Sequence, residues 1–284
     1  MTNIADSSNI SARDDSLAGL RVLITRPQGR GENLADYIQS RGGEALCFPV
    51  IDINPPSSFT GMDKILADVD QYDLLILVSV PGVQSLGRRL VEKELSLGSV
   101  PVAVVGSKTA EACQDFGIKV TYCAGADAGV SANSAPNSEM SSAMNSEGLL
   151  RELELFEKTG KKIAIFRGQD GRECLGSGLE RGGAAVEYIE SYSRSLTRQS
   201  FGPVVERWKK KPFNVVVITS VSILQGLRTL LGEDNAYLLK NSTVLTISER
   251  IAEACRENGF HKLVMANGPA DGEIESALKT ILKQ

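Results

Sequence analysis

The feature that most constrains the fold of this chain is an internal repeat with a period of about 142 residues. Segment 109–117, TAEACQDFG, resembles segment 251–259, IAEACRENG, at an offset of 142 residues. Upstream, the apolar run 75–80 matches the run 216–221 at an offset of 141. Matches in one order at nearly one offset indicate that the sequence arose by internal duplication.

Two further matches extend the duplication toward the amino terminus. Arg26 follows an apolar run and has its counterpart in Arg167, 141 residues later. The triplet Arg-Gly-Gly at 41–43 reappears at 181–183. Each half therefore has a strand–helix–strand block followed by a strand–helix–strand–helix–strand block. The expected strands are 20–26, 45–53, 73–79, 101–105 and 119–123 in the first half, and 162–167, 184–192, 214–219, 243–247 and 262–266 in the second.

The expected strands are short, continuous apolar runs, for example Val-Val-Val-Ile at 215–218. Runs of this kind indicate parallel strands that are buried on both faces. Their alternation with helices of about 10–15 residues predicts βα units, and therefore an α/β fold with open parallel sheets. The repeat by itself favours two domains that follow one another along the chain.

Composition and charge exclude several classes of protein. Of the 284 residues, 42% are hydrophobic and 23% are charged, which is ordinary for a globular protein. The net charge of −4 supplies no overall basic field, so no nucleic acid is expected as a partner. The single histidine, His261, leaves almost no material for a Ser-His-Asp triad or a histidine-built metal site, so no metal is expected.

The cysteines and the apolar pattern bear on the compartment. The five cysteines form no C-x-x-C pair, and their odd number predicts free thiols in a reducing cytoplasm. No apolar run approaches the roughly 18–20 residues that cross a membrane, so no membrane association is expected. Residues 1–18 are expected to form a flexible tail, and the small, polar residues of 124–146 a surface loop.

The candidate binding residues follow the ends of the expected strands. Open α/β sheets bind ligands outside the carboxyl ends of their strands, and hydroxyl, glycine and arginine residues dominate these turns. Together with the amide groups at helix N-termini, such residues hold anionic oxygens, so the turns predict a polyanionic ligand. The candidates are Arg26, Ser79, Gly106, Thr109, Arg167, Gly168, Arg172, Thr219, Ser220 and Arg250.

Each candidate also has a purely structural interpretation. A serine or threonine at such a turn is more often the N-cap of a helix, and a glycine can serve the turn geometry alone. An arginine can simply form a salt bridge, and Tyr192 taken in isolation is expected to be a packing residue. The turns together favour a binding site, because they lie at equivalent sheet edges in both copies of the repeat.

Six motifs follow the strand ends in order, namely ITRP at 24–27, VVGSKTA at 104–110, FRGQDGRE at 166–173, YSR at 192–194, VITS at 217–220 and ISERI at 247–251. In this order, they resemble the motifs of the uroporphyrinogen-III synthase (HemD) family over about residues 19–282. Two departures stand out: Val78 precedes Ser79 where a second hydroxyl is usual, and Glu249 beside Arg250 would repel a carboxylate.

The resemblance implies two flavodoxin-like α/β domains that are built from exchanged blocks of the repeat, with the chain crossing twice between them. Two prolines within 52–58 are compatible with a linker or edge position, because proline is excluded from central strands. The expected segments are 19–48 with 197–284 for the first domain, 57–188 for the second, and 49–56 with 189–196 for a two-stranded linker.

The resemblance also implies an activity, that of a hydro-lyase of haem biosynthesis. Such an enzyme cyclises hydroxymethylbilane, a linear tetrapyrrole with eight carboxylates, to uroporphyrinogen III with inversion of ring D and loss of water. No metal or organic cofactor is implied. Because uncatalysed closure gives the non-inverted isomer, the enzyme must above all position its substrate.

Within this family resemblance, Tyr192 matches the tyrosine that is proposed to give a proton to the departing hydroxyl. A phenol has a usual pKa of about 10, so it is a neutral proton donor at pH 7. The resemblance further implies a cytoplasmic monomer that has at most a transient contact with hydroxymethylbilane synthase, the enzyme that makes the substrate.

Two other classes of protein stay open at this point. A non-enzymatic two-domain hinge protein that binds a small anionic ligand in the cytoplasm would also have two α/β domains and a double crossing. A flavodoxin-like carrier or receiver domain is the third class. A receiver needs clustered aspartates at the strand ends, where this sequence has arginine, serine and glycine.

Overall fold

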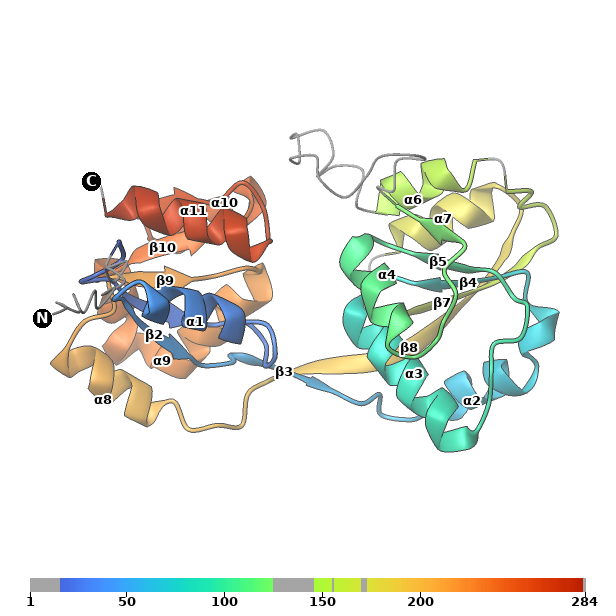
Figure 1. The fold of residues 1–284 in the computed structure, drawn as a ribbon, viewed down its shortest axis with the longest axis horizontal. Coiled ribbons are helices and arrows are strands. Elements are labelled where there is room, and N and C mark those ends of the chain that lie inside the picture. The colour runs from blue at the N-terminus through green and yellow to red at the C-terminus, as the bar shows by residue number, and fades with distance from the viewer. Residues whose placement is uncertain (1–15, 125–145, 155, 170–172, 283–284) are drawn as a thin grey trace, which may run out of the picture. The chain divides into compact units, whose positions relative to one another are not determined.

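The structure is a computed structural model that describes residues 16–124, 146–154, 156–169 and 173–282. The chain divides into two compact units (Figure 1). Unit 1 combines the residues up to Asp52 with those from Leu196 onward, and unit 2 comprises Ile53–Ser195. Both halves of the duplicated sequence therefore contribute to each unit. This is the exchanged arrangement; in a tandem arrangement, each unit would consist of one half.

Unit 1 is a five-stranded parallel sheet with helices on both faces (Figure 1). Its strand order is β11-β10-β9-β1-β2, which is the flavodoxin-like order. The strands are β1 (Arg21–Ile24), β2 (Glu44–Cys47), β9 (Val215–Val217), β10 (Thr243–Thr246) and β11 (Leu263–Met265). The helices are α1 (Glu32–Ser40), α8 (Gly202–Lys210), α9 (Val221–Asn241), α10 (Glu249–Glu257) and α11 (Asp271–Ile281).

Apolar side chains cover both faces of this sheet. Helices α1 and α11 pack on one face through residues such as Leu34 and Leu278. Helices α8, α9 and α10 pack on the other, where Trp208 is fully buried and contacts the Phe213 ring edge-on at 5.4 Å between centroids. Because β1 and β9 are buried on both faces, their sequences are continuous apolar runs.

Unit 2 is a six-stranded sheet in the order β3-β8-β7-β4-β5-β6, and the pairs from β8 to β6 are parallel. Apolar side chains of α2, α3 and α4 cover one face, and those of α6 and α7 cover the other. The strands are β3 (Ile51–Asn54), β4 (Leu74–Leu77), β5 (Val102–Val104), β6 (Tyr122–Cys123), β7 (Lys162–Gly168) and β8 (Ala185–Leu196). The helices are α2 (Thr60–Ala67), η1 (Val69–Gln71), α3 (Val80–Lys93), α4 (Ser107–Gln114), α6 (Ser146–Glu152) and α7 (Cys174–Arg181).

The chain passes between the units along two neighbouring strands, β3 and the end of β8. Thr197 N donates to Val50 O at 2.9 Å, and Asn54 Nδ2 donates to Ser195 Oγ at 2.9 Å. Residue numbers rise along one strand while they fall along the other, so the two strands run in opposite directions. β3 is an edge strand, which is the position that the two prolines after it allow. The predicted class, two flavodoxin-like sheets with exchanged blocks, is confirmed.

Individual boundaries differ from the expected ones. The expected strand 45–53 is two strands, β2 and β3, because Pro49 has no N–H to donate and interrupts the run. The expected strand 119–123 contracts to β6. β8 pairs with β7 as far as Tyr192, so the first half of the expected linker segment 189–196 belongs to the sheet of unit 2.

The expected tail and loop lie largely outside the described residues, namely 1–15 and 125–145. Their ends are part of the fold. Leu17 is fully buried in unit 1, and its N–H donates to Arg41 O at 2.9 Å. Ala124 is 1% exposed in the core of unit 2, and Ser146 is the first residue of α6. No helix among the described residues is both long and apolar enough to cross a membrane.

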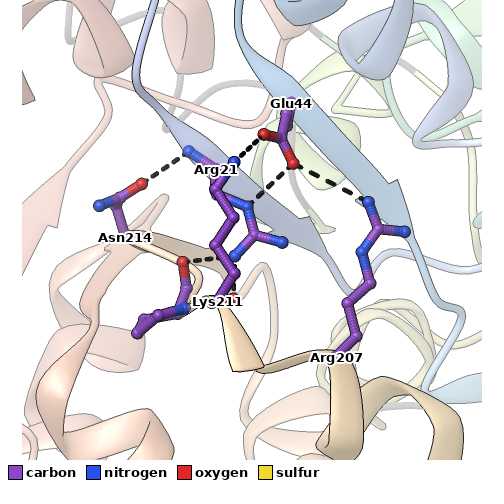
Figure 2. A network of polar contacts seen from close by, with 6 residues as sticks. Arg21, Glu44, Arg207, Lys211 and Asn214 are labelled. Carbon is purple, nitrogen blue, oxygen red and sulfur yellow. Dashed lines mark hydrogen bonds and ion pairs between the residues drawn. The ribbon is translucent and has the colours of Figure 1, made fainter. Parts of the chain in front are cut away.

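At the amino ends of β1 and β2, a polar network joins parts of unit 1 that are far apart in the sequence (Figure 2). Glu44 accepts hydrogen bonds from Arg21 Nε at 2.9 Å and from Lys211, which follows 167 residues later. Arg207 lies 3.9 Å from the same carboxylate, and Arg21 N donates to Asn214 Oδ1 at 2.7 Å. The network therefore attaches the first block of the repeat to the segment that precedes β9.

Replacing Glu44 with glutamine is expected to lower the stability of the protein at pH 7. The hydrogen bonds from Lys211 and Arg21 lower the pKa of Glu44 from 4.5 to about 2. A carboxylate whose pKa is lowered by folding stabilises the folded state at neutral pH and loses this contribution as the pH falls from about 4.5 toward 2. The urea midpoints of the two proteins should therefore differ at pH 7 and converge toward pH 3.

The Glu44 side chain is 44% exposed, so salt should also weaken its contribution. In about 0.5 M NaCl the difference between the urea midpoints should shrink. Equal midpoints at pH 7 in low salt would contradict a stabilising role for the network.

Candidate active site

Each sheet has one point at which the chain connections leave in opposite directions, and this is where open α/β sheets bind ligands. In unit 1 it lies between β1, which connects to β2, and β9, which connects to β10. In unit 2 it lies between β7, which connects to β8, and β4, which connects to β5. The sequence-predicted residues that the structure describes lie in, or shortly after, the strands β1, β4, β5, β7, β8, β9 and β10.

Tyr192 reaches the switch point of unit 2 because β8 contains an irregularity. Along the β7–β8 pair, Arg167 lies opposite Glu190 and Gly168 lies opposite Tyr192, so Ser191 is an extra residue. Such a bulge changes the direction of the side chains that follow it. It brings the Tyr192 ring over Gly168, where a Cβ would lie 2.8 Å from Tyr192 Cζ. Only glycine leaves room for the ring at this place.

The Tyr192 hydroxyl is held by two hydrogen-bond donors. Ser79 Oγ donates to it at 3.1 Å, and Arg194 Nη2 donates to it at 2.9 Å. Arg194 has no acceptor atom, so the phenolic proton cannot be donated to it. No further partner of this hydroxyl is found within the described residues. With Ser79 and Arg194 as the donors, the phenolic oxygen accepts both hydrogen bonds, and its own proton is left for a bound molecule.

Ser79 and its counterpart in the repeat, Ser220, have the same local structure. Both precede a helix in extended conformation, with φ −164° and ψ 155° at Ser79 and φ −158° and ψ 157° at Ser220. Each side chain accepts from the amide three residues on, Gly82 N at 3.4 Å and Ile223 N at 3.1 Å. The hydroxyls therefore act as helix caps, and Ser79 in addition holds Tyr192. Thr219, beside Ser220, is half-buried.

The turn before α4 has no side-chain cap. Gly106 occupies the N-cap position with φ +85°, a conformation that favours glycine. Thr109 is 5% exposed, and its hydroxyl donates to Val105 O at 2.9 Å, so this side chain stabilises the turn. The equivalent residue in the second copy, Ser248 before α10, makes no capping hydrogen bond either. Both helices therefore start with amide groups that no N-cap side chain occupies, as an anion site requires.

Arg167 lies at the end of β7 with its guanidinium over the ring of Tyr188, 4.1 Å from the centroid. One of its nitrogens is 3.9 Å from Glu173 Oε1, and its side chain is 16% exposed. Stacking on an aromatic face directs a guanidinium while leaving its edge for hydrogen bonds. Arg172, the other arginine predicted in this loop, lies outside the described residues.

The two arginines predicted in unit 1 have different surroundings. Arg26 pairs with Asp271 at 2.5 Å and donates to Pro269 O at 3.0 Å, so its charge is already balanced within the unit. Arg250 is exposed on the first turn of α10. The neighbouring Glu249 is paired with Arg256 at 2.6 Å, which places a cation beside the carboxylate that would repel an anionic ligand.

One residue of the site was missed by sequence reasoning. Arg194 belongs to the motif Tyr192-Ser193-Arg194, but only the tyrosine was singled out. The available signal was the spacing, since residues two apart in a strand project from the same face. With that spacing, Arg194 could have been expected to lie beside Tyr192.

The structure shows neither a reactive buried thiol nor a cluster of metal ligands among the residues that it describes. Cys113 and Cys255 are buried, and burial raises the pKa of each to about 11. All five cysteines are free. Buried thiols with raised pKa values are poor nucleophiles at pH 7. Across the described ranges, no three His, Cys, Asp or Glu residues gather in a way that could hold a metal ion.

Fold and site together define the class of protein: a pair of flavodoxin-like α/β units from exchanged halves of a duplicated sequence, with polar groups at the switch point of each sheet. The sequence matches the family model described as uroporphyrinogen-III synthase HemD over residues 32–274. The chain belongs to the uroporphyrinogen-III synthase family.

Individual relatives agree with this assignment. The uroporphyrinogen-III synthase of Escherichia coli K12 is 28% identical over 263 residues, which cover 92% of this chain and 100% of the relative. Among solved structures, a mutant uroporphyrinogen III synthase from the extremely thermophilic bacterium Thermus thermophilus has a TM-score of 0.60 at 16% identity, covering 93% of this chain and 100% of the other. The enzyme from Helicobacter pylori 26695 has a TM-score of 0.58 at 17% identity, covering 93% and 99%. These structures share the fold.

Proposed function

We propose that this chain catalyses the reaction of its family, the cyclisation of hydroxymethylbilane to uroporphyrinogen III with inversion of ring D and loss of water. The chain is thus a lyase of porphyrin and haem biosynthesis. The family model supports this activity, as do curated relatives that match over their full lengths. These matches do not favour the alternative of a non-enzymatic hinge protein for a small anion.

We further propose that Tyr192 is the general acid of the reaction. The observation that carries this proposal is that the phenolic oxygen accepts from Ser79 and Arg194, which leaves its proton for the substrate. The Tyr192 O–H bond breaks, the proton passes to the departing hydroxyl, and the carbon–oxygen bond breaks to release water. The azafulvene cation that remains is attacked by the substituted carbon of ring D. The resulting spiro intermediate then breaks and recloses with the ring inverted.

The proposed role of the other strand-end residues is to bind substrate carboxylates. In unit 2, the N-terminus of α4 behind Gly106 and the stacked guanidinium of Arg167 have the chemistry for this role. In unit 1, the first turn of α10 carries Arg250, and Thr219 lies beside the capped start of α9. Arg26 has the weakest support, because Asp271 already balances its charge.

The cellular compartment and the oligomeric state of the protein are separate proposals from its activity. We propose a cytoplasmic protein, which is supported by the five free cysteines. A monomer, and a transient contact with hydroxymethylbilane synthase, stay predictions. Sedimentation of the chain alone and in a mixture with that enzyme tests both.

One assay tests the proposed function. Hydroxymethylbilane is generated in place by hydroxymethylbilane synthase, the products are oxidised, and the uroporphyrin isomers are separated. With this chain present, isomer III should predominate, whereas the spontaneous reaction gives isomer I. Formation of isomer I alone, at a chain concentration equal to that of the synthase, would overturn the proposed function.

A further inference from the structure

Arg194 contacts the hydroxyl of Tyr192 from the same strand, two residues further along β8. Its Nη2 lies 2.9 Å from the phenolic oxygen, and its Cζ lies 5.2 Å from the centre of the Tyr192 ring. The residue itself is exposed. Within the described part of the chain, the Arg194 side chain donates its hydrogen bond to Tyr192, and no carboxylate forms an ion pair with Arg194. The guanidinium therefore interacts with the tyrosine and not with an acidic residue of the described segments.

We infer that Arg194 is a positioning residue that fixes the direction of the Tyr192 proton and stabilises the phenolate formed when that proton leaves. The inference rests on the proposed function, because it requires Tyr192 to be the proton donor. Proton transfer breaks the O–H bond and leaves its electron pair on the phenolic oxygen. The terminal pyrrole releases a proton when it regains aromaticity after ring closure, and this proton restores the phenol.

The donor chemistry of arginine carries the inference. A guanidinium has five N–H donors and no acceptor, so it cannot compete with the substrate for the phenolic proton. It stays charged throughout the physiological range, so the hydrogen bond strengthens as negative charge develops on the oxygen. A preformed donor aimed at developing charge is the usual way in which proteins lower the free energy of such a transition state.

A purely structural role for Arg194 would require that this side chain contributes to the stability of the fold. Exposed arginines contribute little to the free energy of unfolding, and this one has no carboxylate partner among the described residues. Its replacement is therefore expected to leave the thermal midpoint within a few degrees of wild type. An effect on turnover without an effect on folding is what separates the positioning role from a structural one.

The test uses Arg194→Met and Arg194→Lys, each alone and in the Tyr192→Phe background. In the wild-type background, Arg194→Met should lower kcat about tenfold while KM changes less than about twofold, because the lost interaction exists mainly in the transition state. Arg194→Lys should retain part of the activity, since an ammonium also donates. In the Tyr192→Phe background, neither replacement should lower kcat further, because there is no phenol to hold.

The control is Arg198→Met, which removes another exposed arginine from the segment after β8. It should leave kcat and KM unchanged. An unchanged kcat in Arg194→Met would overturn the inference, and so would an equal loss with and without the tyrosine. A rise in KM alone would make Arg194 a carboxylate-binding residue and would also overturn it. If Tyr192→Phe itself keeps full kcat, the proposed acid falls instead, so the two failures are distinguishable.

Discussion

Replacing Tyr192 with phenylalanine is expected to lower kcat by about tenfold to a hundredfold, with KM almost unchanged. The substitution removes one oxygen and leaves the buried ring, which is 3% exposed, over Gly168. General acids typically contribute about 10²–10⁴-fold to a rate. A factor at or below the lower end of this range is expected here, because the hydroxyl of the substrate also departs without an enzyme. Residual activity should remain, since many contacts share the positioning of the substrate.

The measurement is the initial rate of uroporphyrinogen III formation, together with the ratio of isomers III and I. As turnover falls, spontaneous closure competes, so the share of isomer I should rise. The matched control is Tyr237→Phe, which removes the hydroxyl of a tyrosine that is 48% exposed on α9. Should the Tyr192 variant keep its thermal midpoint and its full kcat, Tyr192 is a packing residue.

The class of fold could be predicted from the sequence, because local patterns determine it. Continuous apolar runs such as that of β4 indicate parallel strands buried on both faces, and the helices between them follow from the spacing. The partner of each block could not be predicted in this way. β1 pairs with β9 through Val22 and Val215, yet β4 (Leu74–Leu77) in the other unit is an equally continuous apolar run. The exchanged arrangement was reached through the family resemblance alone.

The candidate site was predictable only in part, for a related reason. The position of a residue at a strand end follows from the strand, but its contacts depend on distant residues. Arg26 was predicted as an anion ligand, yet it pairs with Asp271, 245 residues away in the sequence. Thr109 lies in the predicted turn, but its hydroxyl donates to the backbone. The bulge at Ser191, which directs Tyr192, leaves no pattern in the sequence.

Gly168→Ala is the second substitution with a large expected effect, because it displaces Tyr192 without changing it. The new Cβ would lie 2.8 Å from Tyr192 Cζ and 2.9 Å from Cε2, which is closer than Cβ atoms approach, and 3.1 Å from the hydroxyl oxygen, which is a tight contact. All three of these nearest atoms belong to the tyrosine, so its ring must move. Overpacking of this kind costs about 1–3 kcal/mol in the free energy of unfolding.

Displacement of the Tyr192 hydroxyl should lower kcat by a larger factor than the loss in the free energy of unfolding alone would indicate. A misplacement of about 1 Å can cost about 10²-fold in rate, and here it also separates the hydroxyl from Ser79 and Arg194. The control is Gly61→Ala on α2, whose Cβ would meet Ile189 at an ordinary 3.8 Å and should leave kcat unchanged.

The double variant Gly168→Ala/Tyr192→Phe decides how the glycine acts. If Gly168 acts by placing the Tyr192 hydroxyl, the double variant should be no slower than Tyr192→Phe alone, because the hydroxyl whose position matters is absent. A loss of kcat that adds to that of Tyr192→Phe would show that the glycine serves the reaction by another route, such as the approach of substrate to the backbone at the end of β7. If the losses do not add, the glycine, the bulge and the two hydrogen-bond donors have one common function, which is to set the position of a single oxygen atom.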